Sequence, residues 1–264
     1  MPGDENLLPA AGLRWGVQDG VATITLSRPE RRNAMTPTMW GGLAEVGAKI
    51  LGDASVRVVV IRGEGPSFCA GIDLRMFSEE GVPGEDRGPG IDDPDFGEHI
   101  RAYQEGYLWL RDDRIVSIAA VQGHAIGAGF QLALACDLRV LADNARLCMK
   151  EPALGLVPDL TGTKPLVELV GRSRAIELCL SARTVDAQEA GQLRLAEYVV
   201  PAGDLETKVA DLARQLTSTD VTAARATKAL LATAAANSLE QQAAAERAAQ
   251  AKLLRGVAGG RPPG

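Results

Sequence analysis

The sequence predicts an α/β protein in which strands and helices alternate, followed by a helical C-terminal region. Two units carry this prediction, because each joins a buried strand to a turn of small residues and then to the start of a helix. One strand covers residues 56–62 and leads to the turn Ala70-Gly71; the other covers residues 118–122 and leads to the turn Gly127-Ala128-Gly129. The third observation is the alanine-rich helical pattern from residue 203 onward.

The remaining elements follow from local signals along the chain. Residues 13–20 and 21–27 alternate around Asp19-Gly20, a dipeptide that favours a tight hairpin turn. A helix is expected from Thr36, an N-cap residue with Pro37 at the first helical position, to about Leu51. Residues 78–98 are rich in Gly, Pro, Asp and Glu, which predicts a loop that acts either as a lid or as a disordered insertion. Further on we expect helices at 99–114, 130–135, 160–169 and 173–181, strands at 138–142, 147–149 and 196–200, and then about three helices.

Composition excludes several functional classes. The formal net charge of −6 and the pI near 5.1 argue against nucleic acid or an anionic membrane as the main partner, although a local basic pocket for phosphates remains compatible. Four cysteines without C-x-x-C spacing and only two histidines predict free thiols and no metal site. The N-terminal stretch lacks a basic region with a long apolar run, so we expect a cytoplasmic protein without a membrane span.

The two turns of small residues suggest a shared chemical task. A turn that precedes a helix leaves backbone N–H groups unpaired, and the helix dipole favours negative charge there. Two such turns can present two N–H groups to one oxygen atom, which is the arrangement of an oxyanion hole. The alternative is that these glycines only allow close packing of a helix.

Four ordered motifs bear on this choice: VATITLSRPERRNAM (21–35), FCAGIDL (68–74), GHAIGAG (123–129) and EPALGLVP (151–158). With them the chain resembles the enoyl-CoA hydratase/isomerase, or crotonase, family over nearly its whole length. The resemblance implies a ClpP/crotonase-like spiral of β-β-α units over residues 1–202 and a helical trimerisation region over residues 203–264. It further implies an acyl-CoA substrate and a homotrimer or a dimer of trimers.

The resemblance also assigns the binding residues. The thioester carbonyl is expected to accept hydrogen bonds from the backbone N–H groups of Ile72 and Ala128. Coenzyme A is expected to contact Arg28, Arg31, Ala70, Asp73, Leu74 and Arg75, the arginines through phosphates or ribose and the others along the adenine pocket. The alternatives are a solvated charged loop for Arg28 and Arg31, and a carboxylate at a helix N-terminus for Asp73.

The catalytic residues implied by the resemblance depart from the hydratase pattern. Hydratases of the family hold water between two glutamates, and Glu151 matches the second of them. Gln131 stands in the place of the first, and an amide cannot exchange protons, so hydration should lose roughly 10²–10⁴ in rate. Asp159 matches an acidic position of members that shift double bonds; its alternative role is to cap a helix that begins near Leu160.

The sequence therefore predicts an enzyme that hydrates or isomerises enoyl-CoA thioesters, with no cofactor beyond the coenzyme A moiety of its substrate. The alternative is a catalytically weak or inactive acyl-CoA-binding protein of the same fold, which the replacement at Gln131 favours. A serine hydrolase is disfavoured because no G-x-S-x-G motif is present. A nicotinamide enzyme is disfavoured because no G-x-G-x-x-G follows the first strand.

Overall fold

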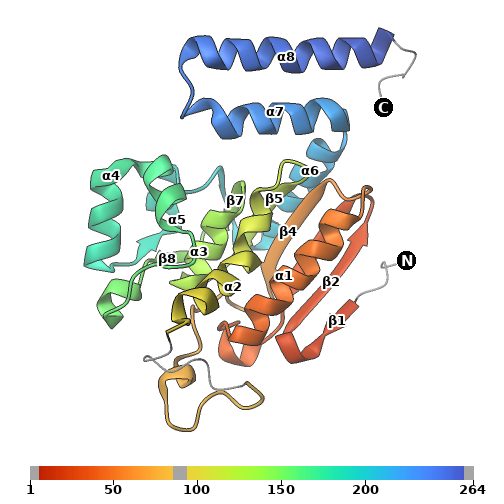
Figure 1. Ribbon diagram of the computed structural model, residues 1–264. Helices are drawn as coiled ribbons and strands as arrows, with labels where there is room; N and C mark the ends of the chain where they lie inside the picture. The colour runs from red at the N-terminus through yellow and green to blue at the C-terminus, as the bar shows by residue number, and fades with distance from the viewer. Residues whose placement is uncertain (1–5, 86–93, 259–264) are drawn as a thin grey trace.

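A seven-stranded sheet forms the centre of the computed structural model, which describes residues 6–85 and 94–258 (Figure 1). Its strands lie in the order β1-β2-β3-β4-β5-β7-β10. Pairing is antiparallel from β1 to β3 and parallel from β3 to β10. The strands are β1 (Asn6–Leu8), β2 (Leu13–Gln18), β3 (Val21–Leu26), β4 (Val58–Gly63), β5 (Val116–Val121), β7 (Leu138–Ala142) and β10 (Tyr198–Val200).

A second sheet of three short strands continues from the first. Its strands are β6 (His124–Ile126), β8 (Arg146–Cys148) and β9 (Val185–Asp186), in that order. The chain passes from β5 to β6 through Gly123, which has a φ of +55° and no room for a side chain, because a Cβ there would lie 2.1 Å from the Pro66 carbonyl oxygen. This step between sheets brings the strand after β5 next to the turn after β4.

The described residues contain eight α-helices and six short 3₁₀ helices. The α-helices are α1 (Pro37–Gly52), α2 (Phe96–Leu108), α3 (Ala128–Ala135), α4 (Thr163–Ser181), α5 (Ala187–Gln192), α6 (Leu205–Thr217), α7 (Val221–Ala234) and α8 (Leu239–Ala258). The 3₁₀ helices are η1 (Pro9–Ala11), η2 (Pro29–Arg31), η3 (Leu74–Phe77), η4 (Trp109–Arg111), η5 (Glu151–Leu154) and η6 (Ala202–Asp204). A non-helical backbone at Gly171 divides α4, in agreement with the two helices predicted there.

Several predicted elements are confirmed and others are corrected. Asp19 and Gly20 both have positive φ and close the predicted hairpin, and the Thr36 side chain accepts a hydrogen bond from the Met39 N–H as an N-cap. The helix predicted at 99–114 begins earlier, at Phe96, inside the predicted loop, and ends at Leu108, where the chain tightens into a 3₁₀ turn. Residues 86–93 of that loop lie outside the described part of the chain.

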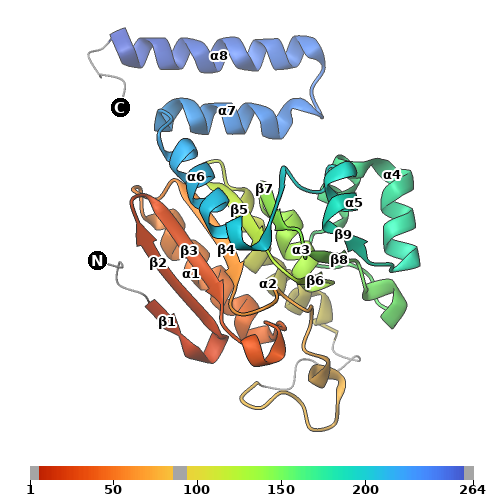
Figure 2. The same ribbon diagram turned by 180° about the vertical axis from the view of Figure 1, so that it is seen from behind.

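Helices cover both faces of the main sheet. In β4 the side chains alternate: Val59 and Ile61 belong to the cluster that contains α1 and α3, whereas Val58 and Val60 belong to the cluster that contains α6. In Figure 2, the view from behind, α6 lies in front of the parallel strands, on the face opposite to α1. Because α6 fills one face of the sheet, it belongs to the core, although the sequence grouped it with the C-terminal region.

Helices α7 and α8 form an antiparallel pair that stands apart from the body in both views (Figures 1 and 2). No residue of α7 is fully buried. Its attachment is polar, because the Lys228 ammonium donates to the carbonyl oxygens of Asp112 and Ile115 and to Asp137 Oδ2, the last at 2.6 Å. No helix in the described residues, α7 and α8 included, is both long and apolar enough to cross a membrane.

Candidate active site

The turn after β4 and the turn after β6 run side by side in the same direction. Cys69 pairs with Ala125 as a parallel bridge: the Cys69 N–H donates to the His124 carbonyl at 2.8 Å, and the Cys69 carbonyl accepts from the Ile126 N–H at 3.0 Å. A Cβ on Gly71 would lie 2.8 Å from the Ile126 carbonyl oxygen, so only glycine fits this close approach. Ile72 and Ala128 each lie three residues after the bridged pair, so they occupy equivalent positions in the two turns.

The peptide groups before Ile72 and Ala128 are both held by their carbonyl oxygens. The Gly71 carbonyl accepts from the Met35 N–H at 2.7 Å, and the Gly127 carbonyl accepts from the Gln131 N–H at 2.9 Å. In a trans peptide the N–H points away from the carbonyl, so these contacts fix the directions of the Ile72 and Ala128 N–H groups. Neither N–H has an acceptor among the described residues, so both are available to a ligand.

Ala128 is the first residue of α3, where an N–H group has no partner inside the helix. It is absent from the residues with positive φ, so its backbone is right-handed, as expected for an alanine at this place. The residue of this turn with a positive φ is the preceding Gly127, at +50°. The positive end of the α3 dipole thus lies at the Ala128 N–H.

Glu151 lies against this second turn. It opens η5 and is 8% exposed. A Cβ on Gly127 would lie 3.0 Å from Glu151 Oε1, which places the carboxyl group against the turn. Oε1 accepts a hydrogen bond of 2.6 Å from the Gln131 amide, while Oε2 is buried and has no partner among the described residues. Burial raises the pKa of Glu151, and the charge of Asp159 raises it further.

Gln131 is fully buried and its amide can adopt one orientation only. Its Oε1 accepts from the Leu160 N–H at 2.9 Å and from the Gly162 N–H at 3.2 Å. Because both of these partners are donors, the carbonyl end of the amide must face them and the NH₂ end must face Glu151. Gln131 therefore ties the Glu151 carboxyl to the loop that precedes α4.

Asp159 lies in this loop and is half-buried. It does not cap a helix, since α4 begins at Thr163 after Gly162. Its backbone carbonyl accepts a hydrogen bond of 2.6 Å from Gln104 of α2. Burial raises the pKa of the Asp159 carboxyl. The charge of Asp159 is among the causes that raise the pKa of Glu151, which lies eight residues earlier in the chain.

The residues expected to contact coenzyme A gather beside the first turn. Asp73 is 5% exposed and accepts from Arg75 Nε at 3.0 Å, from Arg75 Nη2 at 2.7 Å and from Arg28 Nη2 at 2.9 Å. The hydrogen bonds from Arg75 hold the pKa of Asp73 well below its usual range, and the Arg28 guanidinium, which also donates to the Ala34 carbonyl, adds to this effect. Asp73 also accepts from the Arg75 N–H and so caps η3, which is the alternative role considered for it.

The other three expected contacts are more open. Arg31 is exposed on η2, Leu74 is 62% exposed at the start of η3, and Ala70 is half-buried in the turn itself. The loop that carries Arg31 is held against the turn, because the Ala70 N–H donates to the Arg32 carbonyl at 2.9 Å and the Asp73 N–H donates to the Met35 carbonyl at 2.9 Å. The six residues expected to contact coenzyme A therefore lie in the first turn or in the segments held against it.

Sequence reasoning missed two buried residues behind the turns. The Tyr107 hydroxyl on α2 reaches the Ala128 carbonyl at 3.2 Å, and the Met35 sulfur lies 2.9 Å from the same hydroxyl. An aromatic residue at a helical spacing is an ordinary sign of a core position, so no local signal marked Tyr107 as part of the site. Its contact to Ala128 depends on how α2 packs against α3.

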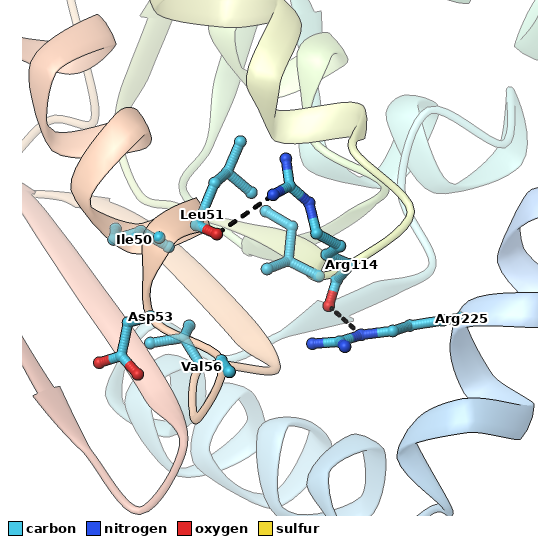
Figure 3. A pocket seen from close by; sticks show the side chains of 9 residues that line it. Ile50, Leu51, Asp53, Val56, Arg114 and Arg225 are labelled. Atoms are coloured by element: carbon cyan, nitrogen blue, oxygen red, sulfur yellow. Dashed lines mark hydrogen bonds between the residues drawn. The ribbon is translucent and has the colours of Figure 1, made fainter.

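A cavity of about 110 Å³ lies elsewhere, between the end of α1 and α7 (Figure 3). Two hydrogen bonds border it: Arg114 Nη1 donates to the Leu51 carbonyl, and Arg225 Nε donates to the Arg114 carbonyl. None of the residues that line it is a candidate site residue, so the cavity is not part of the site. No cluster of three or more His, Cys, Asp or Glu side chains fit for a metal occurs in the described residues.

Comparisons with known proteins bear on this arrangement. The family described as enoyl-CoA hydratase/isomerase matches residues 16–256. The chain belongs to this family. Its structure is also similar to that of a Thermobifida fusca YX protein crystallised with CoA, at 59% identity and a TM-score of 0.90, over 95% of this chain and 96% of that one. Enoyl-CoA hydratase/isomerase proteins of this kind have the crotonase fold, which confirms the predicted fold class.

Two further relatives belong to different organisms. The Arabidopsis thaliana protein named "Probable enoyl-CoA hydratase 2, mitochondrial" is 33% identical over 76% of this chain and 64% of its own length. The match thus spans somewhat less than two thirds of that plant protein. The hydroxycinnamoyl-CoA hydratase-lyase of Pseudomonas fluorescens is 32% identical over 80% of this chain and 75% of its own length.

Proposed function

We propose that this protein is an enzyme of the enoyl-CoA hydratase/isomerase type that acts on an acyl-CoA thioester. The observation that carries the proposal is the Glu151 carboxyl, which is buried against Gly127 and whose Oε2 has no partner within residues 6–85 and 94–258. A buried carboxyl oxygen without a partner costs stability, so its position calls for a ligand. Beside it, the Ile72 and Ala128 N–H groups form an oxyanion hole for the thioester carbonyl.

Double-bond isomerisation is the reaction that these groups support best. The Glu151 carboxylate removes a proton from the carbon next to the thioester of a 3-enoyl-CoA, and the resulting dienolate oxygen is stabilised by the Ile72 and Ala128 N–H groups. Protonated Asp159 then gives a proton to the far end of the dienolate, and the product is the conjugated 2-enoyl-CoA. One proton leaves the substrate and one enters it; transfer of the proton from Glu151 to Asp159 restores the starting state.

Hydration is the weaker activity in this proposal. It requires one group that removes a proton from water and another that donates a proton to carbon. Gln131 occupies the place of the first of the two hydratase glutamates, and its amide oxygen is already engaged by the Leu160 and Gly162 N–H groups. Since only its NH₂ group faces Glu151, Gln131 orients that carboxyl but exchanges no proton. We expect slow hydration of 2-enoyl-CoA through Glu151 alone.

The coenzyme A moiety is proposed to lie along the first turn. Support comes from the Thermobifida fusca YX protein, which is 57% identical in the crystal structure that contains acetoacetyl-CoA, with a TM-score of 0.88 over 94% of this chain and 96% of that one. Arg31 and Arg75 both have exposed surface, at η2 and η3, and suit phosphate groups. Arg28 acts through Asp73, whose carboxylate holds both Arg28 and Arg75. No cofactor beyond the coenzyme A moiety is required by the reaction.

Two assays test the proposal. In the first, a thermal-shift titration with butyryl-CoA measures binding without turnover, and binding should raise the melting temperature. In the second, 3-hexenoyl-CoA and crotonyl-CoA are compared as substrates, and isomerisation should exceed hydration. Binding without either reaction would instead support the alternative, an acyl-CoA-binding protein of the same fold with little or no activity.

The proposed assembly is a homotrimer or a dimer of trimers. Helices α7 and α8 carry large apolar side chains that the single chain leaves exposed, among them Leu231 (70%), Leu239 (88%) and Leu254 (57%). Light scattering at micromolar concentration should report three or six chains, and replacing Leu231 and Leu254 together by Glu should lower the mass. A monomeric wild-type protein would contradict the assembly.

A further inference from the structure

Three buried side chains lie directly behind the two turns. Tyr107 comes from the last turn of α2, Trp40 from the first turn of α1, and Met35 from the loop before α1, and each is at most 3% exposed. The Tyr107 oxygen lies 3.1 Å from Trp40 Nε1, 2.9 Å from Met35 Sδ and 3.2 Å from the Ala128 carbonyl oxygen. One hydroxyl group thus contacts the residue that supplies the second oxyanion donor.

The direction of these hydrogen bonds follows from the available protons. The indole N–H of Trp40 can only donate, so the Tyr107 oxygen accepts from it and keeps its own single proton for another group. Of the two remaining neighbours, a carbonyl oxygen is a stronger acceptor than a thioether sulfur. The Tyr107 hydroxyl therefore donates to the Ala128 carbonyl. Burial raises the pKa of Tyr107 well above its usual value, which keeps this proton in place.

Met35 connects the same hydroxyl to the first donor. Its N–H donates to the Gly71 carbonyl at 2.7 Å, and that carbonyl shares a peptide plane with the Ile72 N–H. Its own carbonyl accepts from the Asp73 N–H at 2.9 Å, so the backbone of Met35 holds the chain on both sides of Ile72. The Met35 sulfur contacts the Tyr107 hydroxyl and Trp40 Nε1.

We propose that Tyr107 is a positioning residue for the oxyanion hole, and that Met35 couples it to the Ile72 donor. The hydroxyl fixes the Ala128 carbonyl, and through the Ala128 backbone it limits the rotation of the peptide whose N–H faces the substrate. Oxyanion donors act by being oriented before charge develops, so a small rotation weakens the transition state more than the bound substrate. This inference rests on the proposed function.

Tyr107→Phe removes the hydroxyl and keeps the ring. The isomerisation kcat should fall roughly tenfold, less than the 10²–10³-fold loss of a whole oxyanion donor, with KM within about twofold of wild type. A direct readout is the infrared stretch of the thioester carbonyl in bound [1-¹³C]butyryl-CoA, a saturated probe that is not turned over. Hydrogen bonds lower this frequency, and the variant should lose at least half of the lowering seen in wild type.

Tyr103→Phe is the matched control. Tyr103 lies one turn earlier on α2 and its ring stacks on Trp40 with centroids 4.5 Å apart, but no contact of its hydroxyl with Ala128 is found among the described residues. This control should keep the wild-type carbonyl frequency and kcat. Equal frequencies in wild type, Tyr107→Phe and Tyr103→Phe, with the wild type showing the lowering, would overturn the inference.

A second variant keeps the test valid if Tyr107→Phe does not fold. Met35→Leu has a similar volume and retains the Met35 backbone contacts, but removes the sulfur that meets the hydroxyl. It should shift the carbonyl frequency toward that of free butyryl-CoA by a smaller amount than Tyr107→Phe, and an unchanged frequency would contradict the coupling through Met35. A wild-type protein that binds butyryl-CoA without lowering the frequency would overturn the oxyanion hole itself, and with it the inference.

Discussion

The Gln131 side-chain amide donates a hydrogen bond of 2.6 Å to Glu151 Oε1. The other end of the amide accepts from the Leu160 and Gly162 N–H groups, so Gln131 is held between a carboxyl group and a loop. The other carboxyl oxygen of Glu151, Oε2, has no hydrogen-bond partner in the described part of the chain, and it is the atom that we propose takes a proton from the substrate. In the proposed mechanism Gln131 orients the carboxyl group and Glu151 transfers the proton.

Gln131→Glu should convert this pair into two carboxyl groups. The Leu160 and Gly162 N–H groups can donate to a glutamate as they do to the amide, and the two carboxyls would share a proton because of their close approach. Hydration of crotonyl-CoA should rise by up to roughly 10²–10⁴, the usual contribution of one general acid or base. Gln131→Met is the control that removes the amide without adding a carboxyl group, and it should lower both reactions. A folded Gln131→Glu variant with unchanged hydration would show that this position does not limit the reaction.

Ala128→Pro deletes one oxyanion donor with little other change. Proline is well tolerated at the first residue of a helix, and the Ala128 N–H that it removes has no acceptor within the described chain. Turnover should fall roughly 10²–10³-fold, the usual loss of one oxyanion donor. Ala128→Gly retains the N–H and should keep most of the activity. Circular dichroism establishes that each variant is folded, and unchanged turnover in folded Ala128→Pro would refute the assignment of this donor.

Much of the fold is readable from local chemistry. Asp19-Gly20 specifies the hairpin because both residues adopt positive φ, and Thr36 specifies the start of α1 because its side chain caps the Met39 N–H. Strands β6 and β9 have three and two residues, too few to show a period-2 pattern, so their position is set by pairing with β8. The sequence therefore predicts the main sheet well and the small sheet poorly.

The candidate site, like the fold, can be predicted from the sequence only where its residues lie close together along the chain. The two turns are visible as small residues after strands, and Glu151 and Asp159 follow from motifs within one stretch of sequence. The clamp on Asp73 is not visible locally, because Arg28 lies 45 residues before it. The resemblance predicts that Arg28 and Arg75 contact coenzyme A, but it does not reveal that both also form ion pairs with Asp73. Contacts between distant segments depend on packing, which single-sequence patterns do not encode.

Asp73→Asn should lower stability in a pH-dependent way. The folded-state pKa of Asp73 lies below its unfolded value of 3.8, so its ionised form stabilises the fold above that pH, and this stabilisation is lost as the pH falls. At pH 7 the variant should lose about 1.5–3 kcal/mol in free energy of unfolding, typical of hydrogen bonds to a charged group. The difference from wild type should shrink toward pH 3 in urea titrations. The exposed Asp113→Asn is the control, and a wild-type-like Asp73→Asn at pH 7 would contradict the clamp.

Glu151→Gln should abolish activity while stabilising the fold. Burial raises the folded-state pKa of Glu151 above 4.5, so the folded protein binds a proton more tightly than the unfolded chain. Stability is therefore lost as the pH rises from 4.5 through the folded-state pKa, and removing the charge should raise the melting temperature at pH 7 but not at pH 4. Both isomerisation and hydration should stop. Full activity of this variant on every enoyl-CoA tested would place the catalytic group elsewhere.

Asp159→Asn separates the two reactions. Isomerisation in our scheme needs a second carboxyl group to protonate the far carbon, whereas slow hydration uses Glu151 alone. The asparagine variant should therefore lose isomerisation of 3-hexenoyl-CoA by roughly 10²–10⁴, the contribution of one general acid, and keep hydration of crotonyl-CoA within about twofold. The backbone carbonyl that Gln104 contacts is unaffected by the change, so the loop should keep its place. Equal losses in both reactions would mean that Asp159 supports Glu151 instead of donating a proton, and retained isomerisation would remove Asp159 from the mechanism.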